Sequence, residues 1–332
     1  MTVARRTSAL VIGTGVSGLA CALRLARSGY RVEAWERGDV AHEVSSVAAV
    51  IWFPYQAGPR ALVDRWALET LRELEQLAHD PTTGITLRSG VQWLPAGVEP
   101  DDLLRELPGH RELAASELRA GRARGVAFRV PVVDMARFLP WLRAQCERSG
   151  ATFVRREIRS LDEAVDACAL VVNCTGLAPR ELAPDRELFA IRGQVLRVPG
   201  DRAREFVIDE DAPEGLCYVV PRGRDVVVGG SATPGREDLA ADTSETARIL
   251  AGARRHLPAL SAADVLEVVV GLRPGRPAVR VEAEVPSPGR LLIHDYGHGG
   301  AGVTLCFGCA DEVARIARRA SNVVASDDVP ST

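Results

Sequence analysis

A cluster of glycines near the N-terminus constrains the fold of this chain more than any other feature. The stretch "VIGTGVSGL" places Gly13, Gly15 and Gly18 between an apolar run, residues 8–13, and a helical pattern, residues 17–28. In a strand–turn–helix unit the first glycine permits the tight turn, the second lets a pyrophosphate approach the backbone, and the third lets the helix pack closely. The helix N-terminus then offers free N–H groups to the phosphates. The motif therefore predicts a dinucleotide-binding unit.

An acidic residue at the end of the next expected strand supports this prediction. The pattern of residues 30–36 indicates a second strand that ends in Glu36, 23 positions after Gly13. A carboxylate at this place can accept hydrogen bonds from both hydroxyls of an adenosine ribose. The alternative, a glycine-rich turn that binds nothing, accounts for neither the acid nor the flanking strand and helix.

Length and composition exclude several classes of protein. The 332 residues are too many for one simple core and fit two domains, and the 46% hydrophobic share is ordinary for a globular protein. A formal charge of −3 offers no basic surface for nucleic acid. No stretch approaches the ~18 apolar residues of a membrane span. The seven cysteines lie mostly in apolar segments, so we expect buried thiols and a cytoplasmic location.

Strand and helix patterns alternate early in the chain, and strands dominate later. We expect further helices at residues 59–78, 110–121, 134–149 and 304–320. Asp134 is the expected N-cap of the third of these helices, and Pro140 is expected to kink it. Residues 191–285 are rich in strand patterns, and "PRGRD" between two apolar runs indicates a hairpin turn.

Two later segments favour a flavin over a nicotinamide. "LVVNCTGL" (170–177) is an apolar strand ending in Cys-Thr-Gly, a pattern that many flavoproteins place beside the pyrophosphate. "LLIHDYGHGGAGVTLCFGC" (291–309) is a strand followed by four glycines within six positions and then a helix. Glycine loses more backbone entropy on folding than any other residue, so this cluster indicates a ligand that touches the backbone.

Six segments resemble, in order and spacing, the D-amino-acid oxidase family, which includes D-aspartate oxidases. They are "VAAVIWFPY", "VVNCTGL", "RGQVLRV", "CYVVPRGRDVVVGG", "GLRPGRPAVRVE" and "IHDYGHGGAGVTLCFGCA". The resemblance covers nearly the whole chain and implies an α/β fold, a two-domain flavoprotein with a Rossmann-like FAD-binding domain and a β-rich substrate-binding domain. The implied FAD-binding domain comprises residues 1–57, 138–190 and 266–332, and the implied substrate-binding domain comprises residues 58–137 and 191–265.

The resemblance also implies a reaction and a non-covalently bound FAD. A D-amino acid would be oxidised to an imino acid, which hydrolyses to a 2-oxo acid and ammonia, while oxygen is reduced to hydrogen peroxide. This chemistry needs a carboxylate anchor and a Cα–H aimed at flavin N5, but no dedicated base if the amine is neutral. Arg273 suits the anchor, because a guanidinium fork matches a carboxylate.

Further site residues follow from the resemblance. The Tyr218 hydroxyl would assist the substrate carboxylate, and the Gly300 carbonyl would accept a hydrogen bond from the substrate amine. Arg280 is a candidate for the pyrimidine edge or a phosphate of the cofactor. The expected cofactor contacts are Gly13, Gly15, Val16, Ser17, Gly18, Glu36, Arg37, Ser45, Ser46, Ala48, Ala49, Ile158, Cys174, Thr175, Gly176, Arg273, Gly299, Gly300, Gly302, Val303 and Thr304. The expected substrate pocket comprises Ile51, Phe53, Tyr55 and Glu214.

Two other motifs are not expected to carry chemistry. Cys306 and Cys309 form a C-x-x-C, but no second pair accompanies them, so no metal site is expected. His298 has glycines on both sides and is expected to be a loop residue near the flavin rather than a catalytic base.

Two departures from the family pattern concern the substrate. Glu214 stands where vertebrate members carry a tyrosine on a mobile lid, and its loop "DEDAPEG" is short and acidic. Phe53 stands where the family has a polar residue. We therefore expect neutral, apolar side chains to be favoured, and D-aspartate and D-glutamate to be disfavoured by an acidic rim.

Other functions stay open at this stage. One is a related flavin amine oxidase that acts on glycine, sarcosine or a cyclic amino acid. Another is a flavin-binding module without turnover, which the presence of Arg273, Tyr218 and the glycine loop argues against. The expected partners are a small-molecule D-amino acid and oxygen, with no nucleic acid and no membrane. The oligomeric state is open, with a homodimer as one candidate.

Overall fold

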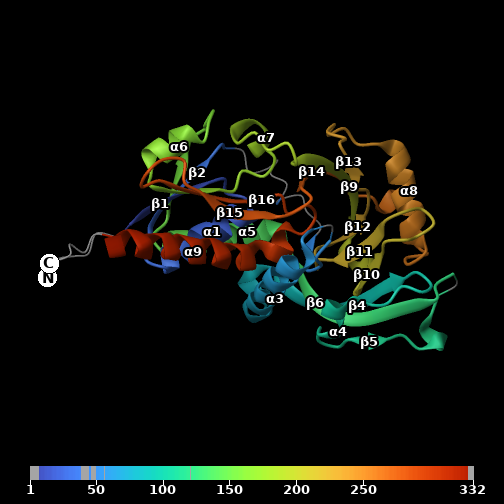
Figure 1. Cartoon of the computed structure of the whole chain (residues 1–332). Helices are drawn as coiled ribbons and strands as arrows, with labels where there is room; N and C mark the ends of the chain where they lie inside the picture. The colour runs from blue at the N-terminus through green and yellow to red at the C-terminus, as the bar shows by residue number, and fades with distance from the viewer. Residues whose placement is uncertain (1–6, 39–44, 46–49, 56, 120, 328–332) are drawn as a thin grey trace.

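The protein is built around two β-sheets that lie side by side (Figure 1). The computed structural model describes residues 7–38, 45, 50–55, 57–119 and 121–327. Helices cover the first sheet on both faces, whereas the second sheet forms most of the other half of the molecule (Figure 1). This mixed α/β architecture confirms the expected fold class.

In the described chain the first sheet has six strands in the order β15-β16-β8-β1-β2-β7. They are β1 (Ser8–Ile12), β2 (Arg31–Glu36), β7 (Thr152–Arg155), β8 (Leu170–Asn173), β15 (Arg280–Glu284) and β16 (Leu291–Tyr296). All neighbouring pairs are parallel except β15 with β16. β1 and β2 are neighbours joined through α1 (Val16–Arg27), so the strand–helix–strand unit predicted from the first glycine motif is confirmed.

Alternate residues of β1 face opposite helical layers. Ala9 and Val11 pack in the core that contains α1, whereas Leu10 and Ile12 pack in a separate core with α6 (Asp162–Ala167). The helices α1, α5 (Met135–Arg148) and α9 (Gly302–Asp327) lie along one face of this sheet (Figure 1). Burial on both faces explains why the β1 sequence is continuously apolar.

The long helices begin within two residues of their predicted positions, and α9 continues seven residues past its predicted end at residue 320. Asp134 caps α5, because its Oδ1 accepts a hydrogen bond from the Ala136 N–H at 3.2 Å. Pro140 lies inside α5, which continues to Arg148. α9 and α3 (Arg60–Leu77) match the other two amphipathic helices expected from periodicity.

The second sheet has ten strands among the described residues. They are β3 (Val50–Ile51), β4 (Ile85–Leu94), β5 (Arg111–Glu112), β6 (Arg124–Val133), β9 (Phe189–Pro199), β10 (Phe206–Asp209), β11 (Cys217–Pro221), β12 (Asp225–Gly229), β13 (Thr233–Pro234) and β14 (Glu267–Gly275). β14 pairs antiparallel with β9 along nine residues. β11 and β12 are antiparallel neighbours, so the hairpin predicted at "PRGRD" is confirmed.

The two faces of the second sheet have different neighbours. α8 (Thr243–Arg254) covers one face, where Leu196 and Val219 pack with Ile249 of the helix. Strand alternation turns Val195 and Tyr218 to the opposite face, which looks toward the first sheet. This alternation decides which side chains reach the space between the sheets.

The helix expected at residues 110–121 is wrong. Its described part contains β5 and a 3-10 turn, Ala115–Glu117, in place of an α-helix. Pairing with β6 overrides the helical pattern: the Leu113 N–H donates to the Gly125 carbonyl at 2.9 Å, and a local ion pair between Arg111 and Glu117, at 2.7 Å, closes the turn. The remaining short helices are α4 (Asp102–Arg105), α7 (Pro179–Leu182) and 3-10 turns at Pro81–Thr83, Gly200–Arg202 and Ala262–Asp264.

The division of the chain into domains stays a prediction. β3 and β14 belong to the second sheet, although the ranges that contain them, 1–57 and 266–332, are expected in the FAD-binding domain.

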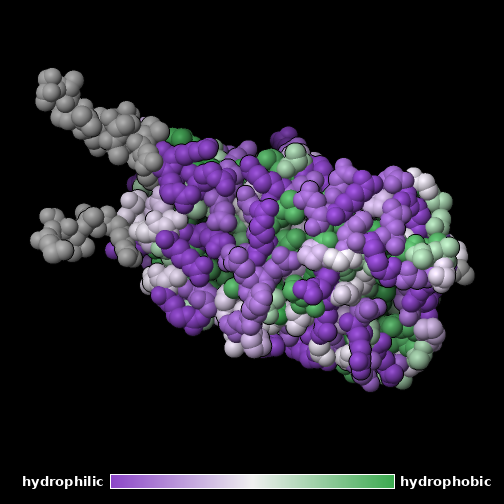
Figure 2. Space-filling model, turned by 90° about the horizontal axis from the view of Figure 1, so that it is seen from below, coloured by the Kyte–Doolittle hydropathy of each residue, from purple (hydrophilic) through white to green (hydrophobic). Residues whose placement is uncertain are grey.

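The face shown in Figure 2 is largely hydrophilic, with hydrophobic residues in small separate groups. None of the helices within the described ranges has the length and apolar character needed to cross a membrane.

Candidate active site

A cavity of about 1020 Å³ lies between the two sheets. Its walls include the carboxyl ends of β1, β2 and β8 on one side and residues of β9, β11 and β14 on the other. Ligands of open α/β sheets bind at the carboxyl ends of the strands. The volume is at the upper end of the roughly 300–1,000 Å³ typical of small-molecule sites, so there is room for an extended ligand.

The first glycine motif packs too tightly for any side chain. Gly13 has φ of +94°, and an added Cβ would lie 2.5 Å from the Cys174 carbonyl oxygen. At Gly18 an added Cβ would lie 1.9 Å from the Gly13 carbonyl oxygen. These contacts hold β1, α1 and the end of β8 together at one edge of the cavity. They leave the N-terminus of α1, capped by Gly15, open toward the cavity.

Ser45 closes this edge from a different segment. The Val16 N–H donates a hydrogen bond to the Ser45 Oγ at 3.2 Å, and both residues line the cavity. Unpaired N–H groups in the first turn of a helix favour an anionic ligand. The geometry therefore suits a phosphate group near Gly15 and Ser17, which also line the cavity.

Glu36 is held by an arginine from α5. Arg143 donates to both carboxylate oxygens, at 2.6 and 3.2 Å, and the Thr14 hydroxyl donates to Oε2 at 3.3 Å. The hydrogen bond from Arg143, opposed by burial, holds the pKa of Glu36 below its usual value, so the carboxylate is ionised at neutral pH. Glu36 lies at the end of β2 beside the cavity wall but does not line it.

The second glycine cluster forms a turn at the start of α9. Gly297 and Gly299 have φ of +79° and +55°, and the Gly299 N–H donates to the Pro274 carbonyl at 2.8 Å. An added Cβ at Gly300 would lie 2.7 Å from the Tyr55 ring. The first turn of α9, beginning at Gly302, directs a second set of free N–H groups at the cavity.

Thr304 joins α9 to the segment that follows β3. Its hydroxyl accepts a hydrogen bond from the Phe53 N–H at 3.1 Å and donates one to the Phe53 carbonyl at 3.0 Å. Ile51 and Tyr55, on either side of Phe53, also line the cavity. The interaction fixes three predicted substrate-pocket residues relative to the glycine turn.

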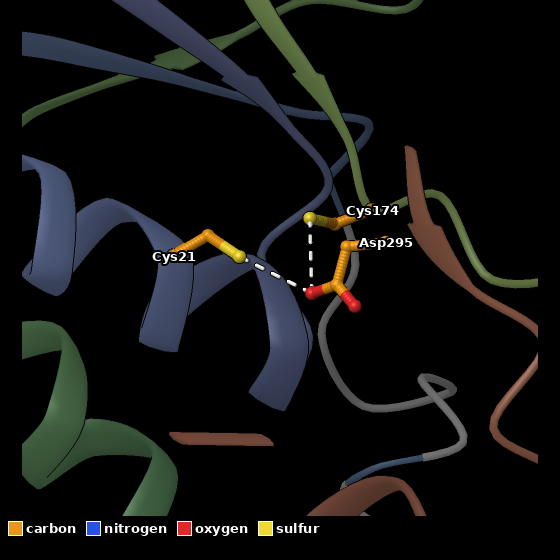
Figure 3. Close-up of side chains that lie close together, drawn as sticks. All are labelled: Cys21, Cys174 and Asp295. Carbon is orange, nitrogen blue, oxygen red and sulfur yellow. Dashed lines mark hydrogen bonds between the residues drawn. The ribbon is translucent and has the colours of Figure 1, made fainter. Parts of the chain in front are cut away.

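A buried carboxylate, Asp295 on β16, precedes this turn and lies close to two thiols, those of Cys21 and Cys174 (Figure 3). The Cys21 thiol donates to Asp295 Oδ2 at 3.1 Å, and the Cys174 sulfur lies 3.9 Å from the same oxygen. His298 Nε2 lies 3.0 Å from Asp295 Oδ1, and His298 itself lines the cavity. Burial raises the pKa of both thiols, so they act as hydrogen-bond donors that compensate the buried carboxylate.

Asp295 therefore connects three segments of the cavity wall. These are α1, the residues after β8, and the glycine turn before α9. The atoms of Cys21, Cys174 and Asp295 that could ligate a metal ion, the sulfurs and a carboxylate oxygen, lie within 4.8 Å of one another. The same holds for the corresponding atoms of Asp295, His298 and Cys309. No sequence motif indicates this cluster, because its members lie up to 288 positions apart.

Arg273 and Tyr218 meet at the opposite end of the cavity. Arg273 comes from β14, and its Nη1 donates to the Ser231 carbonyl at 3.0 Å. The guanidinium lies over Gly193 of β9, where an added Cβ would be 2.2 Å from Nη1. In the described chain Arg273 has no carboxylate partner, so most of its donors are free for a ligand.

Tyr218 lies against two glycines of the neighbouring strand end. Added Cβ atoms at Gly229 and Gly230 would lie 2.0 and 2.8 Å from atoms of its side chain. Burial raises the pKa of Tyr218, although nearby Arg273 acts in the opposite direction. The hydroxyl therefore stays protonated and can donate a hydrogen bond into the cavity.

Most of the residues predicted for the site line this one cavity. They are Gly13, Gly15, Val16, Ser17, Arg37, Ser45, Ile51, Phe53, Tyr55, Ile158, Cys174, Thr175, Gly176, Tyr218, Arg273, Gly299, Gly300, Gly302, Val303 and Thr304. Gly18, Glu36 and Glu214 do not line it. Ser46, Ala48 and Ala49 lie outside the described residues.

Two charged residues of the prediction have other partners. Arg255 binds the Glu214 carboxylate through two hydrogen bonds, at 2.7 and 2.8 Å, and lowers its pKa. Arg280 donates to the Tyr296 hydroxyl and pairs with Glu282 at 2.6 Å, outside the cavity lining.

From the acidic loop "DEDAPEG", Glu210 lines the cavity, whereas Glu214, the residue of this loop predicted for the substrate pocket, does not. Glu210 continues the alternation of β10, so that Ile208 and Glu210 face the cavity and Asp209 faces away. The period-2 pattern of "FVIDE" could have indicated this, had the cavity side of the strand been known.

Comparisons with known proteins show similarity to FAD-dependent oxidoreductases. The family model described as "FAD dependent oxidoreductase" matches residues 8–316. A D-amino-acid oxidase from Rubrobacter xylanophilus is 42% identical over 310 residues, covering 93% of this chain and 95% of that protein. A D-amino-acid oxidase from Streptomyces coelicolor is 40% identical over 93% of this chain and 96% of its own. The solved structure of a glycine oxidase from Geobacillus kaustophilus has a TM-score of 0.78 at 19% identity, with 95% of each chain covered.

Proposed function

The chain belongs to the FAD-dependent oxidoreductase family, and from that premise we propose that it oxidises D-amino acids. The products would be a 2-oxo acid, ammonia and hydrogen peroxide. The observation that carries the proposal is Arg273, a guanidinium without a carboxylate partner among the described residues, beside the Tyr218 hydroxyl in the same cavity.

The residues of the cavity fit a non-covalently held FAD. Two glycine turns admit a ligand close to the backbone, and each precedes a helix N-terminus that favours an anion or a polar ring edge. We assign the pyrophosphate to the turn at Gly13 and Gly15, and the flavin ring to the first turn of α9. Glu36 and Ser45 would serve the adenosine half.

Bound FAD supplies the acceptor for the hydride that leaves the substrate Cα. The chain itself anchors and orients the substrate. Arg273 would bind its carboxylate bidentately, with Tyr218 donating a further hydrogen bond. The Gly300 carbonyl would accept a hydrogen bond from the amine. Catalysis of this kind depends mainly on positioning.

Other features bear on the substrate and the setting. Ile51 and Phe53 line the cavity, which supports the expected preference for apolar side chains. All seven cysteines are free thiols, which fits a reducing compartment such as the cytoplasm. Oxygen as the acceptor and a homodimeric assembly are parts of the same proposal.

Anaerobic reduction of the purified protein tests the function. D-alanine should bleach the yellow colour of the oxidised flavin, and L-alanine should not. Readmitted air should restore the colour and release hydrogen peroxide. Faster bleaching by glycine or sarcosine than by any D-amino acid would instead support a related amine oxidase and contradict the proposal.

A further inference from the structure

One carboxylate faces the substrate end of the cavity without a cationic partner. Glu210 follows β10 and lines the cavity with Tyr55, Tyr218 and Arg273. Within the described part of the chain, its carboxylate accepts a single hydrogen bond, from the Gln92 Nε2 on β4, at a long 3.3 Å. No lysine, arginine or histidine among the described residues lies within ion-pair distance of it.

The neighbouring acids differ in this respect. Asp209 is bound by Arg122 at 2.6 Å, and Glu214 by Arg255 at 2.7 Å. Among the acids of this loop that are at least partly buried, Glu210 is thus the one without an ion pair in the described chain, and Asp211 is exposed to solvent. Burial and the adjacent Asp211 raise its pKa, which reflects the cost of holding an uncompensated charge there. A cationic ligand would remove that cost.

The position of Glu210 relative to the anchor suggests which ligand group it meets. Glu210, Arg273 and Tyr55 all line the cavity, and burial raises the pKa of Tyr55 to about 12, with Glu210 acting in the same direction and Arg273 in the opposite one. With the substrate carboxylate on Arg273 and the amine toward Gly300, the substrate side chain is the group left to face Glu210. The wall on that side is apolar, formed by Phe53, Ile208 and Leu216 among others.

We propose that Glu210 is a specificity-determining residue that binds the cationic end of the substrate side chain, making D-lysine, D-ornithine and D-arginine preferred substrates. The apolar wall would hold the methylene stem, and the carboxylate would hold the terminal charge. This rests on the proposed D-amino-acid oxidation. It refines the preference expected from Ile51 and Phe53, because the stem is apolar and its end is cationic.

Steady-state kinetics on three proteins test the proposal. The substrates are D-lysine, D-methionine and D-glutamate, and the proteins are the wild type, Glu210→Gln and Asp211→Asn. Asp211→Asn is the matched control, because it removes the same charge from the adjacent residue, whose side chain is exposed. Glu210→Gln should lower kcat/KM for D-lysine about tenfold or more, as expected for a charge-assisted hydrogen bond, and leave D-methionine within about twofold. The control should keep the wild-type ratio of D-lysine to D-methionine.

Binding of unreactive carboxylates gives a second readout that does not need turnover. Changes in the flavin absorbance report the Kd of hexanoate and of 6-aminohexanoate, which share a carboxylate and differ by one terminal ammonium group. Wild type should prefer 6-aminohexanoate, and Glu210→Gln should lose this preference.

Different failures have different meanings. If no D-amino acid reduces the flavin, the proposed function itself is wrong. If D-methionine is oxidised but the ratio of D-lysine to D-methionine is unchanged in Glu210→Gln, the inference about Glu210 is wrong and the function stands. An equal loss for all substrates would place Glu210 at the α-amine and also overturn the inference, as would an equal effect of Asp211→Asn.

Discussion

Arg273 has an environment that leaves its guanidinium to a ligand. The backbone of Ser231 takes one donor, Gly193 leaves space for the planar group, and no described carboxylate competes. A fork of donors held in this way recognises a carboxylate by shape as well as by charge.

Replacing Arg273 with alanine is therefore expected to weaken substrate binding and to leave the cofactor in place. Loss of one partner of a buried charged pair costs about 2–5 kcal/mol, so kcat/KM should fall roughly 30-fold or more, mainly through KM. The measurements are KM for D-alanine and the FAD content of the purified variant. Arg273→Lys should recover part of the loss, because it keeps the charge without the fork. A near-normal KM in Arg273→Ala would show that the substrate lies elsewhere.

Glu36 is expected to act on cofactor affinity alone. Glu36→Gln keeps the shape but removes the charge that Arg143 holds in place, so the Kd of the apoprotein for FAD should rise by about tenfold. The rate of flavin reduction at full occupancy should not change. Glu33→Gln is a control on the same strand with an exposed side chain. Slower reduction in fully loaded Glu36→Gln would contradict the assignment to the adenosine half.

The sequence predicted which residues line the cavity better than it predicted which ion pairs the charged residues form. The glycine motifs, expected from their spacing, and Arg273 and Tyr218, implied by the family resemblance, all lie at the cavity. The ion pairs could not be foreseen, because Arg143 reaches Glu36 across 107 positions and Arg255 reaches Glu214 across 41. Which acid is left unpaired depends on such contacts, and no pattern of residue types encodes them.

At the scale of elements, the pairing of β9 with β14 places the anchor. Antiparallel register sets Arg273 opposite Ile191, and its side chain runs along β14 to lie over Gly193. Helices with long apolar periodicity, such as α3 and α9, were predicted well from sequence. The short polar stretch around β5 was not, since its conformation depends on the strand that it pairs with, β6.

Gly193→Ala tests this placement. The new methyl group would overlap the guanidinium, which is the flexible end of its side chain and can move aside. Thermal stability should therefore change little, whereas KM for D-alanine should rise about tenfold through loss of a charged hydrogen bond. Gly252→Ala on α8, where an added Cβ makes ordinary contacts at 3.6 Å, is the control. A large loss of stability with normal KM in Gly193→Ala would mean that the glycine serves packing only.

At the scale of the whole molecule, the site exists only where the two sheets meet. The first sheet contributes glycine turns and helix N-termini, and the second contributes Arg273, Tyr218 and Glu210. The resemblance implied a FAD-binding and a substrate-binding part, but it assigned residues 266–332, which include Arg273, to the FAD-binding part, whereas β14 belongs to the second sheet. The buried Asp295 cluster, which ties three segments of the first half together, was not foreseen.

Stability toward acid is expected to depend on His294 of β16. Burial and nearby Arg280 hold the pKa of His294 below its usual value, with Glu284 opposing them. Unfolding therefore takes up a proton in acid, so the stability from the neutral side chain is complete above about pH 6.5 and is lost as the pH falls through the folded-state pKa.

The comparison is between wild type and His294→Gln at about pH 7.5 and 5.5, on either side of the ordinary histidine pKa. The Tm of the variant should fall less than the Tm of the wild type when the pH is lowered from the higher to the lower value. Glu69 and Asp311, whose pKa values burial raises, act in the opposite direction in both proteins, so the difference between the proteins isolates His294. Equal losses of Tm would contradict this role.

The position of α9 also sets when the cofactor site can form during synthesis. α9 starts at Gly302 and packs on α1, which ends at Arg27. At roughly 5–20 residues per second, a nascent α1 waits on the order of 15–55 s for this partner. During that time β8 lacks its neighbour β16, and the first glycine turn faces no second set of backbone donors. The complete FAD site can therefore form only after the first turn of α9 has been synthesised, so nascent chains that have not reached Gly302 lack one wall of the cavity.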